Sequence, residues 1–172
     1  MSTDQELKEH AEHAHDPFDK RVAASMAIIA AGLAVVSVLG HFCTTEELMA
    51  QQKASDQWAY YQAKSIRRYE SGFAADILAA VKAAEVSQKH QANVAKYEND
   101  SKEISEKATE FERERDLRHH QAVRLDMGEV FLEIAIVLAS LAILSKRPFL
   151  WWGGLGSGLV GAVIALTTVW LR

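Results

Sequence analysis

The apolar residues of this chain of 172 residues gather in three blocks separated by strongly polar sequence. The first block covers residues 22–42, the second covers residues 127–145 and the third covers residues 149–171. A helix needs roughly 20 apolar residues to cross the hydrocarbon core of a bilayer, and each block approaches or reaches that length. The pattern therefore predicts an all-α membrane protein with three transmembrane helices.

The second and third blocks are separated only by residues 145–148, Ser-Lys-Arg-Pro, so these two spans must be antiparallel. Pro148 suits the first turn of the third helix, where a backbone N–H is not needed. Trp151, Trp152 and Trp170 lie near the two ends of that span, where indole rings prefer the headgroup boundary.

The polar segment between the first two spans, residues 43–126, contains no proline and a single glycine, Gly72. Its Ala-, Gln-, Glu-, Lys- and Arg-rich composition is typical of continuous helix. Because the chain leaves and re-enters the membrane on one side, this segment is expected to be a long antiparallel helical hairpin that resembles a coiled coil. The weakest apolar pattern predicts a turn between residues 86 and 100, and Gly40 with the capping-box sequence at residues 44–47 allows a helix break after the first span.

Two periodic stripes predict how the hairpin packs. The first repeats about every eleven residues, a period close to that of an undistorted helix, and the second repeats every seven with several polar positions. The first comprises Trp58, Gln62, Ile66, Tyr69, Phe73, Ile77, Val81 and Ala84; the second comprises Tyr97, Ile104, Phe111, Arg118 and Leu125, interleaved with Ser101, Ala108, Arg115 and Ala122.

Composition changes this picture little. A hydrophobic content of 49% and a charged content of 24% resemble a soluble domain only because apolar blocks and polar segments are averaged together. The net charge of −4 and the absence of a basic tract argue against nucleic acid as a partner and leave membrane lipid. The single cysteine, Cys43, excludes an intrachain disulfide.

Residues 1–21 form a polar leader rich in His and Glu. Lys20 and Arg21 precede the first span, and Lys146 with Arg147 lies on the same side, which predicts a cytoplasmic amino terminus and a periplasmic hairpin in a bacterial inner membrane. The arginines just before the second span oppose this orientation, but acidic residues alternate with them. The first apolar block is too long for a signal-peptide core and is expected to be an uncleaved anchor.

Two carboxylates, Glu129 and Glu133, lie one helical turn apart in the second span. A charged carboxylate in the bilayer costs roughly 3 kcal/mol or more, so such residues are functional candidates by default. His41, at the end of the first span, is expected at a similar depth. A polar or ion site of these three residues is one hypothesis, and a structural role near the headgroups is the other.

Further candidates lie on either side of the spans. The cluster of Trp58, Tyr61, Gln62, Lys64 and Arg67 predicts a packing surface or a partner-binding surface. Small residues at Gly154, Gly158, Gly161 and Ala162, and at Ala23, Ala27, Ala30, Ala31 and Ala34, predict close helix contacts within or between subunits. His10 and His13 are weak metal candidates, and the adjacent His119 and His120 point to different helix faces.

Residues 54–67, Ala-Ser-Asp-Gln-Trp-Ala-Tyr-Tyr-Gln-Ala-Lys-Ser-Ile-Arg, resemble the signature of an uncharacterised bacterial membrane family, domain of unknown function four-three-three-seven. The leader sequence at residues 9–23 and the run Phe-Glu-Arg-Glu-Arg-Asp-Leu-Arg-His-His at residues 111–120 are also similar to that family. The resemblance implies one span, a helical excursion and two further spans. It implies no activity and no catalytic residue.

No nucleophile and base pair, phosphate loop or ligand set is evident, so we expect neither an enzyme nor a cofactor. The leading hypothesis is a homo-oligomeric membrane protein whose helical stalk serves assembly or partner binding. The alternatives are an oligomeric channel or transporter that uses the in-membrane carboxylates and, more remotely, a metal sensor that uses the leader histidines.

Overall fold

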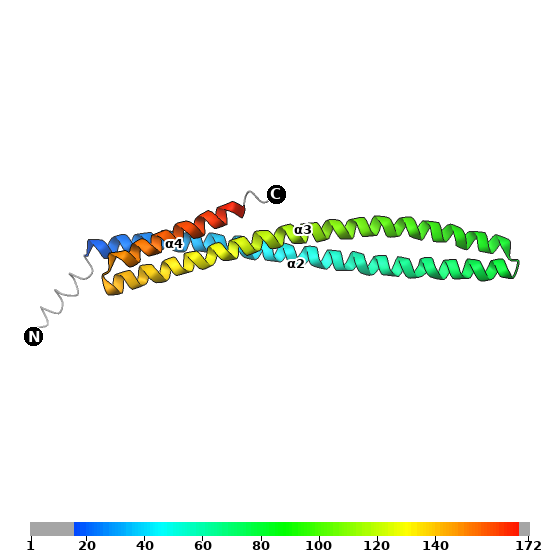
Figure 1. Ribbon diagram of the computed structural model, residues 1–172, viewed down its shortest axis with the longest axis horizontal. Helices are drawn as coiled ribbons and strands as arrows, with labels where there is room; N and C mark the ends of the chain where they lie inside the picture. The colour runs from blue at the N-terminus through cyan, green and yellow to red at the C-terminus, as the bar shows by residue number, and fades with distance from the viewer. Residues whose placement is uncertain (1–15, 169–172) are drawn as a thin grey trace, which may run out of the picture. The chain divides into compact units, whose positions relative to one another are not determined.

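The computed structural model describes residues 16–168. Three helices account for nearly all of them: α2 covers Pro17–Ala80, α3 covers Ala84–Ser145 and α4 covers Pro148–Thr167 (Figure 1). No strand occurs in this described range, so the all-helical class is confirmed. Each helix contains a stretch long and apolar enough to cross a membrane.

Helix α2 continues through the position where the sequence allowed a break. Gly40 lies within it and is buried, and a Cβ added there would lie 3.4 Å from Asp126 Oδ1 and 3.7 Å from Leu125 Cβ. This glycine therefore lies against α3 and does not end a helix. Helix α4 begins at Pro148, in the first turn as predicted.

The turn between α2 and α3 lies at residues 81–83, so the predicted turn between residues 86 and 100 is wrong. Lys82 takes a left-handed backbone conformation, with φ of 61°. The N–H of Ala83 donates to the carbonyl of Leu78 at 2.9 Å, and the N–H of Lys82 donates to the carbonyl of Ala79 at 3.1 Å. These bonds form a Schellman cap, which usually places glycine where Lys82 stands. Because Lys82 stands in place of this glycine, the sequence contains no signal for the turn.

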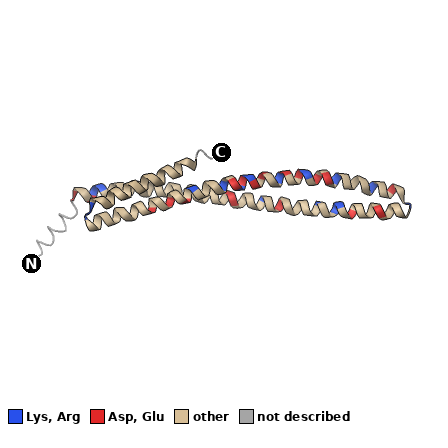
Figure 2. Cartoon of the chain, viewed as in Figure 1, with Lys and Arg blue, Asp and Glu red and all other residues tan. Residues whose placement is uncertain are grey.

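The chain divides into two compact units. The first, here called the membrane unit, comprises the described residues up to Thr44 together with those from His119 onward; the second, the stalk, is Thr45–Arg118. Charged residues colour the stalk helices densely, whereas long uncharged stretches occupy the helices of the membrane unit (Figure 2). Each unit has its own packing.

Two small clusters form the core of the membrane unit. Val22, Ala139 and Ala142 are fully or almost fully buried, and Phe18, Met26 and Trp151 are among the side chains that pack around them. The buried members of the second cluster come from α2 and α3. They are Cys43, Ala122 and Leu125. Alanine dominates because the helices approach each other closely.

In the stalk, members of the predicted seven-residue stripe of α3 contribute buried side chains, and Arg115 of this stripe contacts Gln51 of α2. Ser101, Ile104 and Ala108 are buried. The eleven-residue stripe of α2 packs differently from expectation, because Ile66, Tyr69, Phe73, Ile77 and Val81 are all exposed. The face of α2 that meets α3 is formed mainly by small and polar residues, and its buried members are Ala50, Ala54 and Ala75.

Candidate functional sites

Trp58 anchors the stalk seam. Its Nε1 donates a hydrogen bond to Glu112 Oε1 at 2.8 Å, and its ring meets Tyr61 edge-on with centroids 5.5 Å apart. Trp58 and Tyr61 are half-buried, whereas Gln62 is exposed. The aromatic residues of the predicted cluster therefore pack within the chain, and Arg67 is exposed outside the seam.

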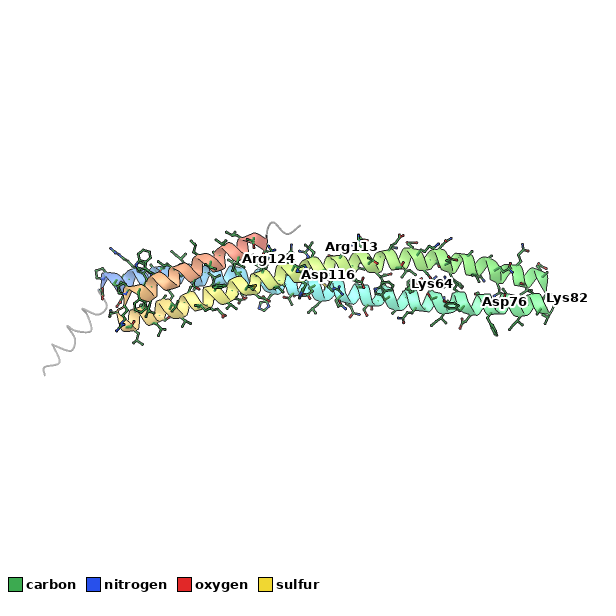
Figure 3. All side chains as sticks on the ribbon, in the orientation of Figure 1. Lys64, Asp76, Lys82, Arg113, Asp116 and Arg124 are labelled. Carbon is green, nitrogen blue, oxygen red and sulfur yellow. The ribbon has the colours of Figure 1, made fainter. Side chains whose placement is uncertain are left out.

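Lys64 is the most enclosed charged residue of this cluster, with a side chain that is 13% exposed. Its Nζ donates to Asp100 Oδ2 at 2.7 Å and lies 5.3 Å and 5.4 Å from the ring centroids of Tyr60 and Tyr97. Lys64 is labelled on α2 in Figure 3. The hydrogen bond to Asp100 raises the pKa of Lys64, with a smaller contribution from Tyr60. The same bond lowers the pKa of Asp100. Two aromatic rings and a carboxylate thus enclose one cation.

The Lys64–Asp100 pair predicts a defined pH range for stalk stability. Because the pKa of Asp100 is lowered from 3.8, its contribution is present above that value and is lost as pH falls through the lower folded pKa. Because the pKa of Lys64 is raised from 10.5, its contribution is lost only as pH rises through the higher folded pKa. We expect Asp100→Asn to lower the melting temperature at neutral pH.

Circular dichroism melts of the full chain in detergent test this prediction. The difference between wild type and Asp100→Asn should be largest between the two ordinary pKa values and should shrink on acidification below 3.8. Glu106→Gln, a change at an exposed carboxylate of the stalk, serves as the matched control. A difference for Asp100→Asn that does not change with pH would contradict the assignment.

Glycines hold α3 and α4 together in the membrane unit. Gly154, Gly158 and Gly161 are buried. A Cβ added at Gly154 would lie 3.0 Å from the carbonyl oxygen of Ala135, and one added at Gly161 would lie 2.7 Å from the carbonyl oxygen of Gly128. The predicted glycine face therefore makes its contacts within one chain.

Gly128 is a packing residue that sequence reasoning missed. A Cβ added there would lie 2.9 Å from the carbonyl oxygen of Gly161, so the two glycines meet at one crossing point. Three buried alanines continue this face of α3 at steps of seven, four and three residues: Ala135, Ala139 and Ala142. That spacing was the available signal. Ser157 Oγ adds a hydrogen bond to the carbonyl of Phe131 at 2.7 Å.

The polar residues predicted to lie in the membrane are on α2 and α3. Glu129 is half-buried, whereas Glu133 and His41 are exposed. Gly40, next to His41, packs beside Asp126, and Glu133 lies seven residues or about 10 Å further along α3. Along the helix axis, His41 is therefore closer to the level of Asp126 and Glu129 than to that of Glu133.

A charge cluster that the sequence did not single out joins the start of α2 to the turn after α3. Lys146 Nζ lies 3.1 Å from Asp16 Oδ2 and 2.5 Å from Asp19 Oδ2. The hydrogen bond to Asp19 is the main cause of the raised pKa of Lys146. Trp151 Nε1 donates to Ser25 Oγ at 3.0 Å in the same unit. The amino end of α2 and the α3–α4 turn are thus adjacent.

The metal candidates His10 and His13 lie outside the described residues. Within residues 16–168, no group of three or more His, Cys, Asp and Glu side chains is arranged to hold a metal ion. His119 and His120 are exposed, with ring centroids 6.0 Å apart.

Comparison with known proteins gives one match. A family model described as domain of unknown function (DUF4337) matches residues 18–171, which is nearly the whole chain. The chain belongs to this family. The resemblance seen in the Trp58 block is thereby confirmed, and the DUF4337 match includes all three helices. No curated protein and no solved structure matches.

Proposed function

We propose that this DUF4337 protein is a non-enzymatic, homo-oligomeric integral membrane protein whose stalk serves assembly or partner binding. The three apolar helices would cross a bacterial inner membrane. The amino terminus would be cytoplasmic, since Lys20, Arg21 and Arg147 are exposed basic residues beside the spans. The stalk would then lie in the periplasm.

The proposed antiparallel arrangement rests on contacts between α2 and α3. Ser87 Oγ donates to the carbonyl of Ala75, next to the turn. Moving away from the turn, Lys64 pairs with Asp100 and Trp58 pairs with Glu112. The residue numbers of the partners therefore rise along α3 as they fall along α2. The same order continues through Arg115 and Gln51. In the membrane unit, the contacts of Lys146 with Asp16 and Asp19 support a common side for these two ends.

One observation supports the homo-oligomer: in the described residues, contacts within the chain cover only one of the two faces formed by small residues. The glycine face of α4 packs against α3, whereas the alanines at one face of α2 are all exposed. These are Ala23, Ala27, Ala30, Ala31 and Ala34. Exposed small residues in apolar helices allow another helix to approach closely, where dispersion and the release of lipid favour association. A second copy of the chain offers an identical face.

Chemical crosslinking in native membranes tests the proposal. We expect multiples of the chain at increasing crosslinker concentration. Ala30→Leu, which adds bulk to the exposed face, should reduce their yield, whereas Val163→Leu, at an exposed residue of α4 that is already large, should leave it unchanged. Only monomer at every crosslinker concentration would refute the homo-oligomer.

A channel or transporter is the second candidate, because Glu133 is exposed in an apolar span. A carboxylate that faces hydrocarbon costs roughly 3 kcal/mol or more, and a water-filled passage between copies would reduce this cost. Flux into proteoliposomes distinguishes this function. Wild type should exceed a variant that combines Glu129→Gln with Glu133→Gln, and equal background leak would exclude the channel.

A further inference from the structure

An uncovered apolar surface follows α2 along the outer half of the stalk. It is here called the outer stripe, and its exposed fractions range from 49% for Ile77 to 70% for Phe73. The members are Ile66, Tyr69, Phe73, Ile77 and Val81. Large side chains at this exposure on one helix face are typical of a protein interface.

Helix α3 packs on the other side of α2 and does not cover the outer stripe. At 100° per residue, Phe73 and the buried Ala75 lie 200° apart around α2. The seam with α3 therefore occupies the face opposite to the outer stripe. Ser87 Oγ donates to the carbonyl of Ala75 at 2.9 Å, which places α3 on that opposite face. Within residues 16–168, nothing covers the outer stripe, which is therefore open to a partner.

Charge at the edges of the outer stripe favours a partner with the same charge pattern. Arg67 and Arg68 lie beside it, as do Glu70 and Asp76, so positive and negative charges balance. Asp76 is labelled in Figure 3. A strongly acidic or strongly basic partner would meet like charges on this surface, and this repulsion would weaken its binding. A second copy carries the same balanced edges.

The size of the surface fits a pair of copies. With two aromatic side chains that each bury about 150–250 Å² when covered, and three aliphatic ones, the outer stripe supplies on the order of 500 Å² per copy. A two-fold pair would bury about 1,000 Å², the lower bound of a specific interface. A groove beside the stripe, lined in part by Gly72 and Val94, leaves room for side chains of the partner.

The stripe is also straight enough for two helices to remain in contact. Its spacing from Ile66 to Ile77 is eleven residues, a period at which a contact line stays nearly parallel to the helix axis. From Ile66 to Val81 the contact would be about 22 Å long. Two stalks on one membrane surface run in the same direction, so like residues would meet across a two-fold axis.

We propose that a second copy of this chain docks on the outer stripe, with Phe73 of one copy beside Phe73 of the other. This inference rests on the proposed function and adds the surface through which the stalks join. The two copies lie in one membrane, and the outer stripe of each covers that of the other. The alanine face of α2 would make a separate contact between the membrane units.

Cysteine crosslinking in native membranes tests the docking surface. In a Cys43→Ser background, we expect Phe73→Cys to form a disulfide-linked dimer on mild oxidation, because a disulfide requires Cα atoms closer than about 7 Å. Ala92→Cys is the matched control, since Ala92 is exposed and lies 200° around α3 from Val94, which contacts Gly72 at the level of Phe73. It should remain at least tenfold less crosslinked.

The outcomes separate this inference from the proposed function. If amine-reactive crosslinkers trap multiples of the chain while Phe73→Cys forms no more dimer than Ala92→Cys, the outer stripe is not the interface and the oligomer still stands. If both methods give only monomer, both proposals fail. Phe73→Asp, which places like charges face to face, should abolish the stalk dimer without loss of helical circular dichroism. Unchanged dimer yield in that variant would also overturn the docking surface.

Discussion

Replacing Gly161 with alanine is expected to destabilise the membrane unit by about 1–3 kcal/mol, the usual cost of overpacking a close contact. The added Cβ would lie 2.7 Å from the carbonyl oxygen of Gly128, 3.0 Å from Phe131 Cβ and 3.1 Å from Leu132 Cγ. Two of these neighbours belong to the α3 backbone or its first side-chain atom and cannot rotate away. Helices α3 and α4 would have to separate, so Gly161→Leu should cost more than Gly161→Ala.

Gly156→Ala is the matched control for this substitution. Gly156 lies in the same helix and has nothing within 4 Å of an added Cβ. Alanine is a better helix former than glycine, so this variant should be neutral or stabilised by about 0.5–1 kcal/mol. Thermal unfolding in detergent, followed by circular dichroism, measures both. Equal melting temperatures for the two alanine variants would show that the helices do not cross at Gly161.

Trp58→Ala is expected to destabilise the stalk by about 2–3 kcal/mol. It removes a half-buried indole, its edge contact with Tyr61 and the hydrogen bond from Nε1 to Glu112. Glu112 is half-buried, so its carboxylate would lose a charge-assisted partner as well as nearby apolar surface. Trp58→Phe keeps one aromatic ring but loses the N–H donor and part of the indole surface, and should cost less than Trp58→Ala, about 1–2 kcal/mol.

Gln62→Ala tests whether this effect is specific to the seam. Gln62 lies one turn beyond Trp58 but is exposed, and substitutions at such positions usually change stability by less than about 0.5 kcal/mol. Urea unfolding of the three variants, followed by far-ultraviolet circular dichroism as a measure of helix content, ranks their free energies of unfolding. If Trp58→Ala proved as stable as Gln62→Ala, Trp58 could not be the anchor of the stalk seam.

The helices and the α3 seam were predictable from sequence because they depend on local pattern. The apolar blocks predicted three helices long and apolar enough to cross a membrane, and the seven-residue stripe included Ser101, Ile104 and Ala108, which are buried in α3. Glycine spacing in α4 likewise predicted Gly154, Gly158 and Gly161 as contact residues. In each case the signal and its physical cause lie within a few helical turns.

Other features depend on partners distant in sequence. The turn at Lys82 contains no glycine. The range in which the turn was predicted, residues 86–100, contains Asn93 and Asn99, and asparagine favours turns. The outer stripe of α2 looked like a core because large apolar residues usually face inward, yet the seam is built from small residues such as Ala75. The asparagines therefore indicated the wrong position for the turn, and the large apolar side chains of the stripe indicated the wrong face of α2 for the seam. The contact made by Gly128 is seen only once Gly161 lies opposite it.

Labelling of single cysteines with a membrane-impermeant thiol reagent tests the proposed topology most directly. In a Cys43→Ser background, Lys82→Cys lies in the α2–α3 turn and Arg147→Cys in the α3–α4 turn. In intact spheroplasts we predict that Lys82→Cys is labelled at once and that Arg147→Cys is labelled only after the membrane is permeabilised. Equal labelling of both cysteines before permeabilisation, in protein that remains in the membrane fraction, would contradict three membrane-spanning helices with the stalk on one side.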